Sequence, residues 1–183
     1  EDQLRLLTLL RHSAEPARAA LRFMHQRNWQ RRRGEGDGSL LRGVHAGRVV
    51  SGVLGVLREH PAHSGVLVSG MALLADIVAA PGGRHAFTSV GGGAWLLGAL
   101  AQHAAHSDAQ YLGLRLLADL TEGGMWPRAQ LPVAVETALI ALRRHGQDAF
   151  VESAALEVLR LLGAAPALAT ILRERLAMEA TGE

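Results

Sequence analysis

The sequence predicts an all-α protein in which pairs of helices stack side by side, as in an α-solenoid. Leu, Ala and Val supply most of its apolar residues, whereas aromatic residues make up only 4% of the chain. This composition is typical of closely packed helices rather than of a β-sandwich. The leucines have helical spacing, and one pattern of two helices recurs along the chain. With 49% hydrophobic residues among 183, the chain can bury a sizeable core.

The recurring pattern has an interval of 42 to 43 residues, and each copy contains two leucine-rich segments. The copies are residues 53–60 with 69–77, 96–103 with 112–120, and 138–145 with 154–162, preceded by a shortened copy at 6–12 and 20–24. In residues 112–120 the leucines occur at i, i+4, i+5 and i+8, which is the apolar stripe of a helix. Each copy therefore predicts a pair of helices.

Small residues recur at one register of the second helix: Gly70, Gly113 and Ala155. We expect them to let a neighbouring helix approach closely. Between the two helices of the third pair, Ser107 or Asp108 is expected to be the N-cap.

Histidines recur at the end of the first helix of each pair: His60, His103 and His145. We expect them to bond the last free carbonyl groups of that helix. His63 and His106 complete two His-x-x-His spacings, but a structural zinc site needs four ligands and the chain has no cysteine. No metal site is therefore predicted.

Residues 84–100 resemble the first two helices of an armadillo repeat, because a short helix ends in a glycine pair and an apolar helix follows. Residues 109–121 resemble the third helix of such a repeat. The resemblance implies a right-handed α-solenoid of about four armadillo-like repeats, the first of them degenerate. The expected units are residues 1–26, 44–80, 84–121 and 128–163, with a loop at 27–43 and a C-terminal capping helix at 166–180. Residues 1–183 would form a single domain, which we expect to be part of a larger protein.

In armadillo proteins the third helices line a concave groove, and in the peptide-binding members a Trp and an Asn recur there. The resemblance places Ala72, Arg115 and Glu157 at the Trp position, and Asp76, Asp119 and Leu161 at the Asn position. Because neither residue type is present, recognition of nuclear signals is not expected. The candidate partner-binding residues are Ala72, Asp76, Arg115, Asp119, Glu157 and Arg160. The predicted function is an intracellular scaffold or adaptor domain, cytoplasmic or nuclear, that binds a protein or peptide.

Two alternatives remain. The arginines Arg27, Arg31, Arg32 and Arg33, with Trp29 among them, are a possible site for RNA or phosphate. A hydrated flexible loop is the preferred interpretation of this segment, since Glu35 and Asp37 follow. The second alternative is a module that self-associates end to end as a homo-oligomer.

Catalysis and membrane insertion are not expected. The run Gly91-Gly92-Gly93 lacks the following Gly-Lys-Ser/Thr of a phosphate-binding loop, and no acid–base pair has catalytic spacing. Residues 85–107 carry no Asp, Glu, Lys or Arg, but their glycines and histidines argue against a transmembrane helix. All 19 basic residues are arginine, which explains a pI of 10.3 at a net charge of only +2. No cofactor is predicted, and nucleic acid is not the favoured partner.

Overall fold

The computed structural model describes residues 12–32 and 44–164, and all regular structure in these two ranges is helical. The predicted all-α class is therefore confirmed for this part of the chain. The helices are α2 (Ala14–Arg32), α3 (Val44–Glu59), α4 (Ser64–Val78), α5 (Gly83–Ser89), α6 (Gly92–Gln102), α7 (Ser107–Glu122), the 3-10 helix η2 (Arg128–Gln130), α8 (Leu131–His145) and α9 (Ala149–Leu161).

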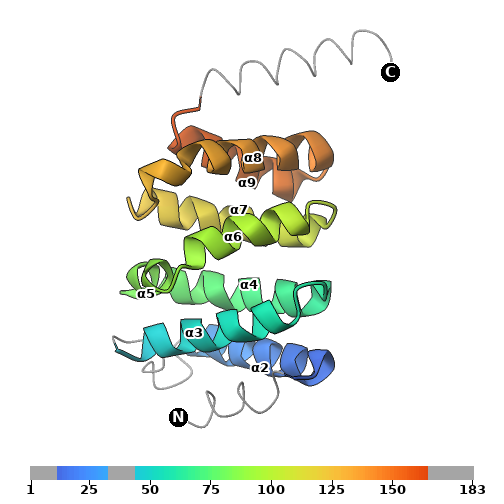
Figure 1. The fold of residues 1–183 in the computed structure, drawn as a ribbon, viewed down its shortest axis with the longest axis vertical. Coiled ribbons are helices and arrows are strands. Elements are labelled where there is room, and N and C mark those ends of the chain that lie inside the picture. Colours follow the sequence, from blue (N-terminus) through green and yellow to red (C-terminus); the bar gives the residue numbers. More distant parts are fainter. Residues whose placement is uncertain (1–11, 33–43, 165–183) are drawn as a thin grey trace.

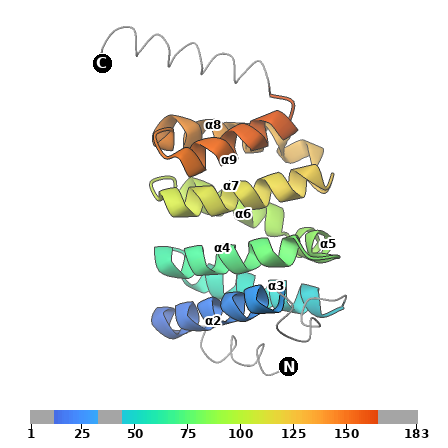
Figure 2. The same ribbon diagram turned by 180° about the vertical axis from the view of Figure 1, so that it is seen from behind.

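The helices lie in two layers along the long axis of the molecule. Helices α2, α4, α7 and α9 pack against one another in this order and form one layer (Figure 2). Helices α3, α5, α6 and α8 form the other layer (Figure 1). The pairs α3/α4, α6/α7 and α8/α9 each contribute one helix to either layer, and a leucine-rich core is buried among them.

Within two of these pairs a leucine of the first helix packs directly on a glycine of the second. A Cβ atom at Gly70 of α4 would lie 2.6 Å from Leu57 Cδ2, and one at Gly113 of α7 would lie 2.5 Å from Leu100 Cδ2. Any larger side chain would therefore require Leu57 or Leu100 to move from its position in the core. The predicted packing role of Gly70 and Gly113 is confirmed.

The glycine run 91–93 turns the chain between α5 and α6. Gly91 has a φ of +75°, in the left-handed region that a glycine adopts without strain. A Cβ atom at Gly92 would lie 2.6 Å from the carbonyl oxygen of Phe87. The run therefore joins two helices at close quarters, as the sequence predicted.

His103 and His145 connect neighbouring helix pairs, which corrects the prediction that they cap their own helices. Nε2 of His103, at the end of α6, lies 2.6 Å from the carbonyl oxygen of Pro61 in the α3–α4 loop. Nε2 of His145, at the end of α8, lies 2.7 Å from that of Ala104 in the α6–α7 loop. A carbonyl oxygen only accepts hydrogen bonds, so Nε2 donates in both contacts. Each imidazole thus bonds the loop of the preceding pair.

The prediction that Ser107 or Asp108 is the N-cap of α7 is also wrong, because the N-cap is the preceding residue, His106. Helix α7 begins at Ser107, so His106 is the N-cap, and its side chain makes no capping bond. The corresponding caps do so in the other pairs: His63 Nδ1 accepts from the N–H of Val66 at 3.2 Å, and Asp148 caps α9. Ser107 lies inside the first turn, where its side chain cannot cap.

Helix α2 is longer than predicted. It continues to Arg32, so Arg27, Trp29, Arg31 and Arg32 lie in its last turns and not in a loop. Arg and Gln are good helix formers, and no glycine or proline interrupts the segment before Gly34. Arg33, the remainder of the predicted loop, residues 1–11 of the first unit and the predicted capping helix at 166–180 lie outside the described residues.

The contact between His103 and Pro61 leads to a prediction about stability. We expect His103→Ala to lower the free energy of unfolding by about 1–3 kcal/mol, because a buried hydrogen bond is lost. His85→Ala is the matched control, since His85 is exposed on α5. Urea unfolding followed by circular dichroism measures both. Equal midpoints for the two variants would show that the imidazole does not couple the pairs.

The contact between Leu100 and Gly113 leads to a second prediction. Gly113→Val should destabilise the protein by about 1–3 kcal/mol through overpacking. Gly98→Val is the control, because a Cβ atom there meets nothing within 4 Å. Adding Leu100→Ala should recover part of the loss in Gly113→Val, as measured by thermal unfolding. Additive losses in the double variant would contradict this contact.

Candidate functional site

A groove lies between α7 and α9 on the layer of α2, α4, α7 and α9, and it has a volume of about 340 Å³. We call it the α7–α9 groove. Its lining residues are Tyr111, Arg115, Ala118, Asp119 and Glu122 of α7, with Phe150, Ser153, Ala154, Glu157 and Leu161 of α9.

The start of this groove is aromatic. The rings of Tyr111 and Phe150 are tilted by 58° with their centroids 5.6 Å apart. Phe150 is 69% exposed, the largest exposed fraction among the large apolar side chains of the described residues. The guanidinium of Arg115 lies 5.6 Å from the centroid of the Tyr111 ring, and its Nη1 donates to the Tyr111 hydroxyl at 3.3 Å. Arg115 therefore holds the Tyr111 ring in place beside Phe150.

The other end of the groove is acidic. Asp119 and Glu122 lie in the last turn of α7, which has no basic residue there. Carboxylates at the C-terminus of a helix are unfavourable, because the helix dipole is negative at this end. Glu122 is 68% exposed, and its carboxylate lies 4.0 Å from Arg84 Nη2, so this pair is loose. The carboxylates at the C-terminus of α7 thus have an electrostatic cost for folding, and Glu122 presents negative charge to solvent.

Glu157 and Arg160 pair with each other on α9. The guanidinium donates two hydrogen bonds to the carboxylate, at 2.8 Å and 2.7 Å. The hydrogen bond from Arg160 lowers the pKa of Glu157, and the same contact raises the pKa of Arg160. Both groups therefore stay charged near neutral pH, and each offsets the charge of the other. At this end of the groove, Asp119 and Glu122 add to the negative charge of the C-terminus of α7.

Three of the six predicted partner-binding residues line the α7–α9 groove: Arg115, Asp119 and Glu157. Arg160 is next to it through its pair with Glu157. Ala72 and Asp76 lie on α4, the neighbouring helix of the same layer. They line neither this groove nor the concave region between α2, α4 and the start of α7. Asp76 is 17% exposed, and its Oδ2 lies 3.0 Å from His25 Nδ1 of α2. Asp76 is thus engaged within the fold.

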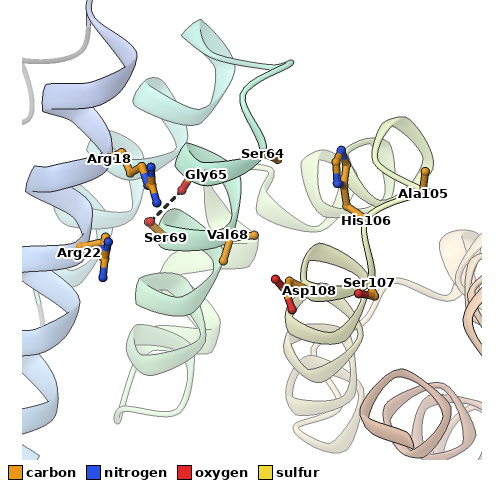
Figure 3. A pocket seen from close by; sticks show the side chains of 10 residues that line it. All are labelled: Arg18, Arg22, Ser64, Gly65, Val68, Ser69, Ala105, His106, Ser107 and Asp108. Atoms are coloured by element: carbon orange, nitrogen blue, oxygen red, sulfur yellow. Dashed lines mark hydrogen bonds between the residues drawn. The ribbon is translucent and has the colours of Figure 1, made fainter. Parts of the chain in front are cut away.

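A second concave region lies between α2, α4 and the start of α7, with a volume of about 570 Å³ (Figure 3). We call it the α2–α4–α7 hollow. It is lined by Arg18 and Arg22 of α2, by Ser64, Gly65, Val68 and Ser69 of α4, and by Ala105, His106, Ser107 and Asp108 at the start of α7. Asp108 is one helical turn from Tyr111, so α7 separates the hollow from the aromatic end of the groove.

The sequence reasoning missed Tyr111, Phe150 and the arginine pair of α2. A signal existed for Tyr111, the only tyrosine of the chain, because it precedes Arg115 by four residues and therefore shares its helix face. Phe150 comes two residues after the cap Asp148, at the register of Asp108 and Gly65 in the other pairs. A large aromatic residue at this register, where the other pairs have a small or polar residue, could have indicated a binding role for Phe150.

Within residues 12–32 and 44–164, no three side chains of metal-ligating type are grouped as a metal site requires. No helix there has the length and apolar character needed to cross a membrane.

Comparison with known proteins gives no match. No family model, no curated protein and no solved structure is significantly similar to this chain.

Proposed function

We propose that the chain is an armadillo-like α-solenoid that acts as a protein-interaction scaffold or adaptor. In this proposal the α7–α9 groove binds a segment of a partner polypeptide that carries an aromatic or large apolar residue and a basic residue. The observation that carries the proposal is the pair of the half-buried Tyr111 and the exposed Phe150 at one end of a groove whose other end bears Asp119 and Glu122.

The solenoid assignment is supported by contacts that recur at the interval of the sequence pattern. The contact of Leu57 with Gly70 corresponds to that of Leu100 with Gly113, 43 residues further along. The bonds of His103 and His145 span 42 and 41 residues, and each joins one helix pair to the preceding one. Such neighbour-to-neighbour contacts are typical of repeat proteins.

The binding role is supported by the distribution of apolar and charged groups in the groove. The residues that dominate binding energy in protein interfaces are enriched in Tyr, Trp and Arg, and the groove has Tyr111 and Arg115 beside the exposed Phe150. Tyr111 and Asp119 are eight residues apart on one helix, which corresponds to about 12 Å along its axis. A short extended peptide of roughly four residues spans that distance. The groove therefore suits a peptide segment better than a small molecule.

The charge of the groove favours a basic polypeptide over nucleic acid. Among its lining residues, Asp119, Glu122 and Glu157 are acidic and only Arg115 is basic. A phosphate backbone would be repelled by this end, because nucleic-acid binding depends on neutralising phosphates with Lys and Arg. The basic side chain of a peptide would instead be attracted to the carboxylates and to the C-terminus of α7.

The groove is formed by two helices that are held by the core on one side. Leu114, Leu117, Val151 and Val158 are fully buried and fix the positions of α7 and α9. A partner would therefore order few groups of the protein when it binds, which keeps the entropic cost of binding low.

The test is a selection of peptides from a random displayed library on the full chain. We expect the enriched peptides to share an aromatic or large apolar residue and an Arg or Lys. Phe150→Ala should weaken a selected peptide by about 5- to 30-fold, as expected for an interface hot spot of 1–2 kcal/mol. Fluorescence anisotropy with the labelled peptide measures this affinity. Ile140→Ala is the control, since Ile140 is exposed on α8 in the opposite layer.

A charge reversal tests the acidic end separately. Asp119→Arg with Glu122→Arg should abolish binding of the basic peptides and, in a fresh selection, enrich acidic ones. Glu136→Arg, an exposed position on α8, should leave binding unchanged. Selected peptides without a basic residue, or an unchanged affinity in Phe150→Ala, would refute the assignment of this groove.

A further inference from the structure

The α2–α4–α7 hollow has a charge character opposite to that of the α7–α9 groove. Arg18 and Arg22 are one helical turn apart on α2, and Figure 3 shows both side chains on the α2 side of the hollow, with that of Arg18 extending toward α4. Asp108, across the hollow on α7, is the only carboxylate among its lining residues. Two guanidinium groups on one wall form a pair of forks suited to an oxyanion.

Arg18 is positioned by contact with α4. A Cβ atom at Gly65 would lie 3.0 Å from Arg18 Nε and 3.1 Å from its Cδ, so the arginine lies directly across the first turn of α4. Its ion pair with Glu15 is loose, at 3.8 Å, and Glu15 is 72% exposed. The guanidinium of Arg18 is therefore held over the hollow without being neutralised by a tight partner.

The polar groups around the arginines favour the same ligand. Ser64 and Gly65 are the first two residues of α4, whose N–H groups have no acceptor within the helix. Helix α4 has no acidic residue in its first turn, and Glu15 of α2, whose carboxylate lies 3.4 Å from Nε2 of the N-cap His63, is largely exposed. The hydroxyl of Ser69 already donates to the carbonyl oxygen of Gly65 at 2.8 Å, so the arginines and not Ser69 would supply the side-chain donors (Figure 3).

We propose that the α2–α4–α7 hollow binds an anionic side chain, a carboxylate or a phosphoryl group, on the partner segment whose aromatic and basic residues occupy the α7–α9 groove. This inference rests on the proposed function and adds a third recognition element to it. Arg18 and Arg22 bind the oxyanion, and the first turn of α4 forms the floor beneath it. The partner segment is thus anionic at one end, aromatic in the middle and basic at the other end.

The spacing of these elements follows from the packing of the helices. The hollow and the groove share α7, with Asp108 bordering one and Tyr111 the other. Packed helices are about 8–10 Å apart, so the distance from the arginine pair to the aromatic pair is on the order of 10–20 Å. An extended chain covers this distance with roughly three to six residues.

The experiment uses a peptide selected on the wild-type chain and three synthetic versions of it. These versions carry Ala, Glu or phosphoserine at a position three to six residues from the aromatic residue. On the wild-type chain we expect the Glu and phosphoserine versions to bind about tenfold more tightly than the Ala version. Arg18→Gln with Arg22→Gln should remove this difference and leave the affinity of the Ala version unchanged. A larger gain with phosphoserine than with Glu would identify the phosphoryl group as the preferred anion.

Arg128→Gln is the matched control, because Arg128 is exposed on η2 beside α8. Equal binding of all three versions to the wild-type chain would overturn the anion site. If Phe150→Ala still weakened peptide binding in that case, the proposal for the α7–α9 groove would remain supported. If the two arginine substitutions weakened all three versions equally, the arginines would act on the fold and not on the anion. A selection that returned no aromatic–basic peptide would overturn both proposals together.

Discussion

The contact of a leucine with a glycine inside two of the three helix pairs is the constraint on which the rest of the structure depends. Where Leu57 packs on Gly70, and Leu100 on Gly113, the backbones of the two helices approach closely. In each case a buried leucine takes the place of a missing side chain, so the separation and register of the pair are fixed together. The histidine bonds to Pro61 and Ala104 then join each pair to the preceding one. The layer of α2, α4, α7 and α9 is the result.

The fixed register of the helices also explains how one repeated backbone arrangement can carry different exposed side chains from one helix pair to the next. Positions that correspond between α7 and α9 carry Tyr111 and Ser153, or Arg115 and Glu157, while most buried positions of the two helices are leucine, alanine or valine. The buried residues determine where a side chain lies, and the exposed residues at the same register are free to vary. The binding properties of the face are therefore set by residues that contribute little to the core.

The sequence predicted the helices and their close contacts because both depend on local spacing. The stripe of leucines in 112–120 and the recurrence of Gly70 and Gly113 needed no knowledge of the neighbours. The acceptors of His103 and His145 lie about one interval away along the chain, and helical spacing places a residue on a face without saying which loop that face meets. For the same reason, Asp76 and Asp119 share a register but have different surroundings: Asp76 contacts His25 of α2, whereas Asp119 lines a groove with α9. The contact between Tyr111 and Phe150 could not be predicted from the sequence, because it depends on how α7 packs against α9.

The direction of the helices links the two concave regions. The residues in contact show that α2 runs parallel to α4, since Arg18 meets Gly65 and His25 meets Asp76, and that α7 runs parallel to α9 (Figure 2). Parallel helices in one layer place their N-termini along one edge and their C-termini along the other, so their dipoles add. Some charged side chains follow this polarity, because Arg18 and Arg22 lie by the N-terminus of α4 and Asp119 and Glu122 lie at the C-terminus of α7. Others oppose it: Asp108 and Glu152 lie in the first turns of α7 and α9. A bound segment whose anionic end met Arg18 and Arg22, and whose cationic end met Asp119 and Glu122, would therefore lie in the orientation that the helix dipoles also favour.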